Sequence, residues 1–403
     1  MDEQFYCYFE SQRRRRKRKR EEESRRARKQ IKESGNRIFR MITAVFCFIL
    51  AFQYGPIADV PRPLIPDHRF DLQNIGTSYT GGLQAENLFR FSSEQLLYLM
   101  DALRIPSVMR TPHRDKYFGI EGLCIVLRRL VFPVRYMDMV QLFGRATAPM
   151  SRIHNHMMAW LYTRWNHLND FDAARVMPVL ADWAEAVARI CPNSFEHVWA
   201  FIDGTVRRTC RPGPNPSRLP PGITADMCQR AQYSGHKHYH GFKAQALISP
   251  SGMVVHIYGP VDGRRNDAFM LAESGLLPQL VLLTIGGISY LVYGDSAYPV
   301  TRNMTVPFCS TVATPGSIEA RINEEMAVAR TCTSEWWYGI CTNTFQTLDF
   351  ARWQRQWLTA PALQYFVATL LVNCRTCLDG GNRVSRFFHC SPPSLGDYLS
   401  GHF

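Results

Sequence analysis

The segment His197–Thr209 (HVWAFIDGTVRRT) limits what this chain can fold into more than any other stretch. Apolar, strand-favouring residues fill positions 198–202 and lead directly into Asp203-Gly204, which is typical of a buried β-strand. We therefore expect the strand to end at Asp203, with the carboxylate at the mouth of a sheet. A turn aspartate without any further role is the alternative, because Asp-Gly is a common turn pair.

Two later segments favour a metal site over a simple turn. Tyr290–Gly294 (YLVYG) is a second short apolar run, and it too is followed by an aspartate, Asp295. Glu335 lies in a long helical stretch further along the chain. Three carboxylates that converge cannot easily stay ionised together without a cation. Asp203, Asp295 and Glu335 therefore predict a site for Mg²⁺, whose preferred ligands are oxygen atoms.

The charge of the chain is concentrated near its beginning. The 403 residues carry a net charge of +13, and between Ser11 and Arg40 Lys and Arg outnumber Asp and Glu by 15 to 4. The run Arg13–Arg20 (RRRRKRKR) predicts a nuclear import signal or a DNA-binding arm, with a merely solvated charge run as the alternative. The rest of the chain is only mildly basic, so its charge alone is no argument for nucleic-acid binding.

An apolar block, Met41–Phe52, follows the basic tail. It is shorter than the ~20 residues that span a bilayer, so we do not expect a membrane protein. Basic residues ahead of an apolar run do resemble a signal anchor, and an anchored form stays open as an alternative. The expected organisation is a basic disordered tail (1–40), the apolar block with a proline-rich linker (41–84), a helical domain (85–190) and a catalytic domain (191–400).

Twelve cysteines are scattered through apolar segments, which suits a reducing compartment better than a disulfide scaffold. Cys374 and Cys377 form a CxxC pair upstream of His389 and Cys390, a pattern that superficially resembles a zinc site. The pair lies, however, within a stretch that reads as a buried helix. We therefore expect these cysteines to be core residues, with zinc as the alternative.

The region from Ser92 to about residue 190 has helical periodicity. Ser92 begins a capping box, and Thr147 is expected to cap a helix that runs to Trp165. A short helix before Gly144 and this longer helix after it fit a helix-turn-helix, although any helical bundle contains such turns. The residues predicted to be exposed on the second helix and to contact DNA are Ser151, Arg152 and Asn155, with His156 beside them.

From about residue 191 the pattern becomes mixed. Three strands, a helix, two strands and a long helix are expected in that order, which is the element order of an RNase H-like fold, a mixed sheet flanked by helices. In that fold the first and fourth strands are neighbours, which would put Asp203 next to Asp295, and a late helix presents Glu335. Beyond the first strand, the expected strands are 242–248, 253–258, 290–294 and 309–313, and the expected helices are 267–283, 317–350 and 361–378.

Several stretches, in order, resemble the PIF/Harbinger transposases and the nucleases derived from them, within the DDE superfamily. They are FIDGT (201–205), QRAQYSGHKHYHGFK (229–243), SGMVVHIYGPVDGRRNDAFMLAESGLL (251–277), YGDSAYP (293–299), EWWYG (335–339) and SPPSLGDYL (391–399). Residues 123–153 also resemble the helix-turn-helix of that family, so that the resemblance covers roughly residues 85–400.

This resemblance implies an RNase H-like catalytic domain that depends on Mg²⁺ or Mn²⁺ and that cleaves and joins DNA strands at inverted repeats. It implies that Asp203, Asp295 and Glu335 form the acidic triad. It also implies a separate Myb/SANT-like partner protein that helps DNA binding and nuclear import.

Two positions depart from the family pattern. Thr333-Ser334 precede Glu335 where the family usually has an arginine and then an aliphatic residue, and Asn266 stands where histidine is common. Neither removes a predicted metal ligand, but both are compatible with a decayed or domesticated copy. Asp267 is expected to cap a helix rather than to take part in catalysis.

Basic residues near the predicted site are candidate contacts for DNA phosphates, although each alone also fits a solvated surface charge. These candidates are Arg207, Lys237, Arg264 and Arg265. His236, His238 and His240 alternate, so on a strand they would share one face, toward DNA or in a structural role, with a metal-binding trio as the alternative.

The sequence thus predicts a nuclear, Mg²⁺-dependent DNA endonuclease or transposase whose catalytic domain follows an all-α helix-turn-helix domain. The alternative is a domesticated, catalytically inactive protein that binds DNA or recruits a partner. The DNA target and the oligomeric state stay open.

Overall fold

The computed structural model describes residues 70–72, 84–213, 224–355 and 358–403, all within one compact unit, Ala51–Phe403. The predictions for Arg13–Arg20 and Met41–Phe52 therefore lie outside the described residues. Among the described helices, none combines the length and the apolar character needed to cross a membrane.

The first part of the described chain is mainly helical, as expected. Its elements are α3 (Gln84–Phe89), α4 (Ser93–Ala102), β1 (Val108–Arg110), β2 (Lys116–Phe118), α5 (Gly119–Val131), η1 (Tyr136–Met139), α6 (Val140–Phe143), α7 (Thr147–Trp165), η2 (Asn166–Asn169), α8 (Ala173–Val176), η3 (Met177–Val179) and α9 (Leu180–Ile190).

Local signals at the helix ends account for some of these boundaries. The capping box at Ser92 is confirmed, because its side chain accepts a hydrogen bond from the Gln95 N–H and the Gln95 side chain bonds back. Gly144 ends α6 in the left-handed conformation that glycine favours. The prediction that Thr147 caps α7 is wrong, since Ala146 is the N-cap and Thr147 is already helical. The β1–β2 hairpin had no clear periodic signal in the sequence.

The second part supplies one mixed sheet and the helices that cover it. Its elements are β3 (Val198–Arg208), α10 (Ala225–Gln232), β4 (Tyr233–Ser234), β5 (Tyr239–Ile248), β6 (Val254–Asp262), α11 (Asp267–Ser274), α12 (Leu276–Leu280), η5 (Val281–Leu283), β7 (Thr284–Ile285), β8 (Ile288–Ser289), β9 (Leu291–Tyr293), β10 (Met304–Thr305), α13 (Ile318–Arg330), η6 (Thr331–Glu335), α14 (Trp336–Thr344), η7 (Gln346–Leu348), α15 (Pro361–Leu378), α16 (Arg383–Phe388) and α17 (Leu395–Ser400).

The strand order of this sheet is β10-β9-β3-β5, with β4 and β6 also paired to β5. β3, β5 and β6 are antiparallel neighbours, whereas β9 runs parallel to β3 and β10 runs parallel to β9. The prediction that the first and fourth strands of this region are adjacent is confirmed by the β3–β9 pairing.

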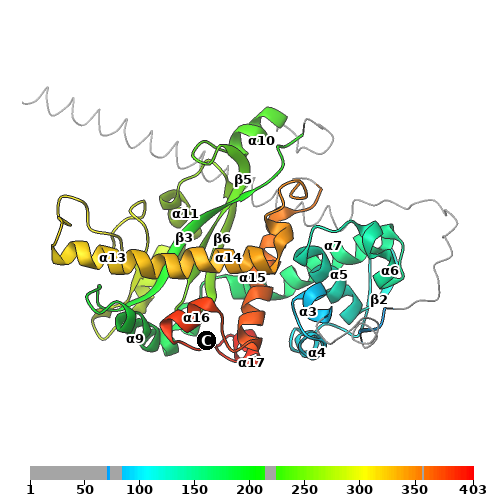
Figure 1. Ribbon diagram of the computed structural model, residues 1–403, viewed down its shortest axis with the longest axis horizontal. Helices are drawn as coiled ribbons and strands as arrows, with labels where there is room; N and C mark the ends of the chain where they lie inside the picture. Colours follow the sequence, from blue (N-terminus) through cyan, green and yellow to red (C-terminus); the bar gives the residue numbers. More distant parts are fainter. Residues whose placement is uncertain (1–69, 73–83, 214–223, 356–357) are drawn as a thin grey trace, which may run out of the picture. The chain divides into compact units, whose positions relative to one another are not determined.

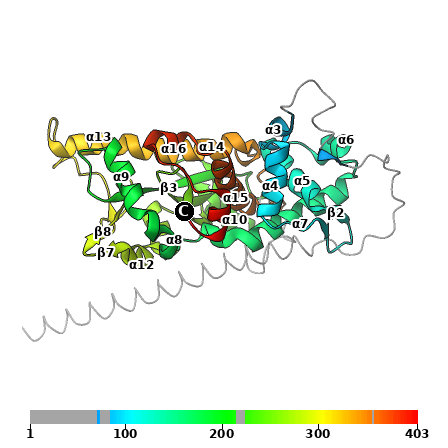
Figure 2. The same ribbon diagram turned by 90° about the horizontal axis from the view of Figure 1, so that it is seen from below.

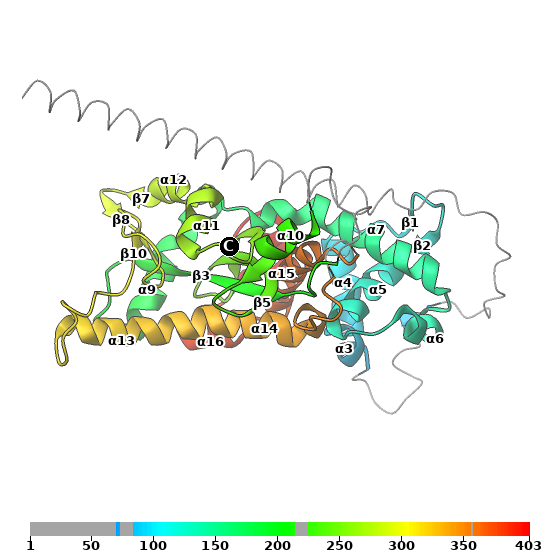
Figure 3. The same ribbon diagram turned by 90° about the horizontal axis from the view of Figure 1, so that it is seen from above.

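Helices cover both faces of the sheet. Figure 1 shows α13 and α14 crossing the sheet as one long helical rod, and Figures 2 and 3 show α12 on the opposite side of the sheet from that rod. The core on the α11–α12 side joins Ile202, Leu247 and Val292 of three strands to Leu271 and Leu280 of these helices. Burial of this apolar surface holds β3 in the middle of the domain.

Several of the expected elements differ in the structure. β3 does not end at Asp203 but continues to Arg208, because β5 pairs with it along that length, from Asp203 opposite Ala246 to Arg208 opposite Gly241. The last strand is Met304–Thr305 rather than 309–313, since Met304 pairs with Val292 of β9. The helix expected over 267–283 is interrupted at Gly275, which adopts the left-handed conformation.

The long helix expected over 317–350 also differs. It ends at Thr344, and a π-helical turn, Thr331–Glu335, interrupts it between α13 and α14. A π-helical turn inserts one residue and changes which side chains face the sheet. This matters for the site, because the inserted turn includes Glu335.

Candidate active site

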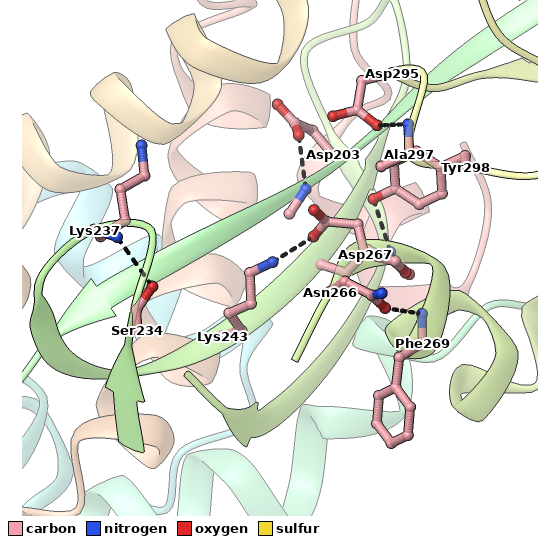
Figure 4. A network of polar contacts seen from close by, with 12 residues as sticks. Asp203, Ser234, Lys237, Lys243, Asn266, Asp267, Phe269, Asp295, Ala297 and Tyr298 are labelled. Atoms are coloured by element: carbon pink, nitrogen blue, oxygen red, sulfur yellow. Dashed lines mark hydrogen bonds and ion pairs between the residues drawn. The ribbon is translucent and has the colours of Figure 1, made fainter. Parts of the chain in front are cut away.

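Asp203 and Asp295 lie at the same level of two neighbouring parallel strands. Phe201 of β3 is in register with Tyr293 of β9. Asp203 comes two residues after Phe201, and Asp295 comes two residues after Tyr293. β9 ends there, so Asp295 lies in the loop beyond it, where its carboxylate accepts a hydrogen bond from the Ala297 N–H at 2.9 Å. Figure 4 shows the two side chains close together. The sheet topology thus brings together the first two predicted acids.

Asp203 is held in a mostly buried position. Its side chain is 17% exposed, its Oδ1 accepts a 2.8 Å hydrogen bond from the Gly204 N–H, and its Oδ2 lies 3.5 Å from the Arg330 guanidinium. Its backbone carbonyl accepts a 2.7 Å hydrogen bond from the Tyr338 hydroxyl, which ties β3 to α14.

The pKa of Asp203 is raised to about 6. Burial is the main cause, and the negative charges of Asp295 and Asp267 act in the same direction. The charge of Arg330 and the Gly204 N–H oppose the rise but do not cancel it. A cation at this position would therefore stabilise the ionised carboxylate.

A third aspartate, Asp267 at the start of α11, lies beside this pair (Figure 4). Its Oδ1 is 2.9 Å from the Lys243 ammonium, and the two side chains are 20% and 12% exposed. A Cβ atom built on Gly204 would lie only 1.9 Å from the same Oδ1, so the carboxylate fills the space that the glycine leaves. The expectation that Asp267 caps the helix is wrong, because Asn266 is the N-cap and accepts from the Phe269 N–H at 2.8 Å.

Glu335, the third predicted acid, is the last residue of the π-helical turn η6, which packs against β3 and β5. Its side chain is exposed, whereas Thr333 and Ser334 just before it are buried. Within the part of the chain that the structure describes, no three His, Cys, Asp or Glu side chains lie close enough together to hold a metal ion. The geometry therefore brings Asp203 and Asp295 together but does not close a triad with Glu335.

The residues predicted to contact DNA from α7 are less exposed than expected. Ser151, Arg152 and Asn155 are all of intermediate burial rather than exposed. Arg152 donates from Nε and Nη2 to the two oxygens of Asp115, at 2.6 and 2.7 Å, in a bidentate pair. The prediction of exposed side chains is wrong here, because the β1–β2 hairpin supplies a carboxylate next to α7.

The basic residues of the sheet domain fall into two groups. Arg207 is packed inside, with its guanidinium 5.7 and 5.5 Å from the ring centres of Tyr338 and Tyr365. Lys237, Arg264 and Arg265 lie in loops, and the side chains of the two arginines are 54% and 38% exposed beside Asp262. Only the loop group has the exposure that phosphate contacts need.

The expected alternation of His236, His238 and His240 on one strand face is wrong. Residues 235–238 form a turn, in which His238 has a positive φ of 55°, and only His240 lies on β5. Cys374 and Cys377 are buried in α15, as expected for core residues.

Several residues of the site had no role in the sequence-based prediction. Lys243 and Arg330 supply its positive charges, and Tyr298 accepts a 2.8 Å hydrogen bond from buried Gln245, which also donates to the Asp267 carbonyl. Tyr298 lies within the same YGDSAYP stretch as Asp295, so the resemblance gave a signal for it. Arg330 gave none, because it lies five residues before Glu335 in the sequence and its approach to Asp203 follows from the path of the helix and its π-helical turn.

Comparison with known protein families gives a match over part of the chain. Residues 202–372 match the sequence model of a family described as DDE superfamily endonuclease. The matched segment contains Asp203, Asp267, Asp295 and Glu335 and begins within β3. No curated protein and no solved structure matches the chain.

Proposed function

We propose that this protein is a metal-dependent DNA endonuclease or transposase of the DDE type, related to the PIF/Harbinger transposases, with an RNase H-like catalytic domain. The observation that carries the proposal is the parallel pairing of β3 with β9, which sets Asp203 and Asp295 side by side in the segment that matches DDE superfamily endonucleases. Two neighbouring carboxylates at a sheet edge are the start of an oxygen-ligand site suited to phosphodiester chemistry.

The chemistry of the donors suits a hard divalent cation such as Mg²⁺ or Mn²⁺, although of the three proposed ligands the described structure brings only Asp203 and Asp295 together. All the candidate ligands are carboxylates, and the pKa of Asp203 is raised by its burial and by two neighbouring acids, so the site has more negative charge than its surroundings stabilise. Asp203, Asp295 and Glu335 are the proposed ligands. When bound, such a cation would activate the attacking hydroxyl or water and stabilise the leaving oxygen.

The remaining residues would hold and orient the DNA. The exposed side chains of Lys237, Arg264 and Arg265 would bind phosphates near the site as charge-assisted donors. The Tyr338 hydroxyl fixes the backbone of Asp203 relative to α14, so that the helix with Glu335 stays in register with β3. Positioning of this kind is most of what a protein contributes to phosphoryl transfer.

The helical domain and the basic tail complete the proposal. Helices α6 and α7 would act as a helix-turn-helix, with Ser151 and Asn155 facing the DNA and Arg152 joining them only where its pair with Asp115 opens. Arg13–Arg20 would direct the protein to the nucleus, with a Myb/SANT-like partner that helps import and DNA binding. A reporter fused to residues 1–40 should accumulate in the nucleus, and a cytoplasmic reporter would contradict this part.

One observation favours the alternative function, a catalytically inactive DNA-binding or partner-recruiting protein. The Arg330 guanidinium lies 3.5 Å from Asp203 Oδ2 and partly neutralises the acid that a metal ion needs. A cleaving enzyme has to exchange this contact for the cation, whereas a binding protein can keep it.

Nicking of supercoiled DNA by the full chain distinguishes the two functions. We expect nicked product with Mg²⁺ or Mn²⁺, none with a chelator, and none for Asp203→Asn in either condition. Asp182→Asn removes the same charge from an exposed position in the first turn of α9 and is the matched control. DNA binding without nicking by wild type under all metal conditions would support the inactive alternative.

A further inference from the structure

Helix α16 presents two exposed arginines that have no acidic partner. Arg383 and Arg386 are three positions apart, so their side chains lie on the same face of the helix. Among the described residues neither forms an ion pair with a carboxylate, whereas Arg375 of the preceding helix pairs with Asp379 at 3.2 Å. Two like charges on one helix face repel each other. The positive charge of this face is therefore left uncompensated within the described structure.

An aromatic side chain holds the first of these arginines in place. The guanidinium of Arg383 lies over the ring of Trp336, 3.6 Å from its centre. Trp336 also makes an edge-to-face contact with Phe387 of α16, with the ring centres 5.7 Å apart. Stacking on a ring orients a guanidinium without using its N–H groups. The donors of Arg383 thus have a set direction and are free to bind an anion.

The helix itself is fixed to the face of β3 that carries Asp203. Phe388 is fully buried, and its ring centre lies 5.9 Å from that of Phe201. Phe201 and Asp203 are two residues apart on β3, so their side chains are on the same face of the strand. At the other end of α16 the Asn382 side chain caps the helix and donates to the Gly252 carbonyl at 2.8 Å. Both ends of this short helix are therefore held.

The two arginines lie beside the third proposed acid. Trp336 directly follows Glu335, and α16 packs against both α14 and the π-helical turn that contains Glu335. Figures 1 and 2 show α16 alongside the rod formed by α13 and α14. Within the described part of the chain, Glu335 forms no ion pair with Arg383 or Arg386. The positive face of α16 is thus next to the proposed cleavage site without being neutralised by it.

We propose that Arg383 and Arg386 form a second phosphate-binding surface for the DNA substrate, with Trp336 as a positioning residue for Arg383. This inference rests on the proposed function, since that function supplies DNA as the ligand. A phosphate suits the surface because a guanidinium donates to two phosphate oxygens at once, and the anion relieves the repulsion between the two arginines. A stacked base suits it less, because Arg383 already covers a face of the Trp336 ring.

Fluorescence anisotropy tests the inference without any cleavage step. A labelled DNA duplex of mixed sequence is titrated with the full chain in a chelator, at several salt concentrations. Arg383→Gln and Arg386→Gln should each weaken binding by about eightfold near 0.1 M salt and lower the salt-dependence slope by about 0.9. The double variant should lower the slope by about 1.8, and its difference from wild type should shrink as the salt concentration rises.

Two further variants control for charge and for folding. Arg383→Lys keeps the charge but loses the planar fork, so it should keep the wild-type slope and still bind several-fold more weakly. Arg321→Gln removes the same charge from an exposed position of α13, about 20 Å along the rod from Glu335, and should bind like wild type. If Arg383→Gln does not fold, Arg386→Gln keeps the test, because it leaves the contact with Trp336 intact.

Wild-type affinity and slope in the double variant would overturn this inference. That result would also follow if the two arginines bound an acidic partner protein instead of DNA. Nicking of DNA by the wild type would then still support the proposed function, so the two failures can be told apart. A lower melting temperature of Arg383→Gln with an unchanged slope would make the arginine purely structural. No DNA binding by wild type would overturn both the inference and the proposed function.

Discussion

Asp115 and Asp203 are two largely buried carboxylates that differ in how completely nearby groups compensate their negative charge. Asp115 is 13% exposed and Asp203 is 17% exposed, so burial is similar, and each lies near one arginine. The Asp115 pair is bidentate at 2.6 and 2.7 Å, whereas Asp203 has a single contact at 3.5 Å and two other acids nearby.

The pKa values of the two acids move in opposite directions. Burial alone would raise the pKa of Asp115, but hydrogen bonds from Arg152 and Thr111 and the charge of Arg152 lower it overall. Burial raises the pKa of Asp203 to about 6, since its single 3.5 Å contact with Arg330 does not offset the effect of burial. An acid whose charge is fully compensated by its partners stabilises the fold. An acid whose charge is not compensated is a candidate for binding a ligand.

Of the substitution effects that we expect from this difference between the acids, the largest should be on DNA cleavage. Replacing Asp203 or Asp295 by asparagine, or Glu335 by glutamine, should lower the cleavage rate by at least about 10³-fold, because each removes a proposed ligand of a cation that would contribute several kcal/mol. Asp115→Asn should leave cleavage by the folded protein within a small factor of wild type. Equal losses in both groups of variants would erase the distinction between the two kinds of acid.

The second largest effect should be a lower free energy of unfolding when Asp115 is replaced. Asp115→Asn removes the carboxylate that binds the partly buried Arg152 guanidinium in a bidentate pair, which should cost about 3 kcal/mol of unfolding free energy. Denaturant unfolding measures this directly. A fully stable Asp115→Asn protein with weakened binding to one DNA sequence would instead mean that Arg152 reads a base.

A smaller effect is the opposite pH dependence of the two acids. The folded-state pKa of Asp203 lies above its unfolded value, so stability from its protonation is present below about pH 4 and is lost by about pH 6. In a chelator, Asp203→Asn should therefore be more stable than wild type by about 1–3 kcal/mol at pH 7 and by almost nothing at pH 4.

Asp115 should behave in the reverse way. Its folded pKa is lowered, so its contribution is present at neutral pH and disappears as the pH falls through the folded pKa. The cost of Asp115→Asn should accordingly shrink in acid. Unfolding curves of wild type and both variants at pH 4 and pH 7 measure the two differences in unfolding free energy. The prediction would be contradicted if both differences changed with pH in the same direction.

The weakest effect concerns the exposed arginines of the loop between β6 and α11. Changing Arg264 or Arg265 to glutamine should weaken DNA binding equally on all sequences and reduce the salt-dependence slope by about 0.9 for each phosphate that is no longer neutralised. Arg189→Gln, at an exposed position in the last turn of α9, is the matched control and should leave the slope unchanged. Binding titrations at several salt concentrations check this.

The adjacency of the first and fourth strands, and with it the meeting of Asp203 with Asp295, could be predicted from the amino-acid sequence. Short apolar runs with strand periodicity are local signals, and the parallel neighbour of β3 follows from the order of elements that those signals give. The ends of the strands were less certain. β3 passes through Asp203 because β5, which follows some 35 residues later, supplies hydrogen-bond partners that no local pattern reveals.

The other groups around the two aspartates could be identified only from the folded chain. Asp267 takes the space left by Gly204, Lys243 comes from the next strand, and Arg330 reaches Asp203 from a helix interrupted by a π-helical turn. Arg152 was predicted to be exposed on α7, but it is partly buried and binds Asp115 of a hairpin for which the sequence gave no clear signal. Periodicity tells which side of an element is buried, but a charge pairs with whichever opposite charge lies near it in the folded chain, and that distance exists only after packing.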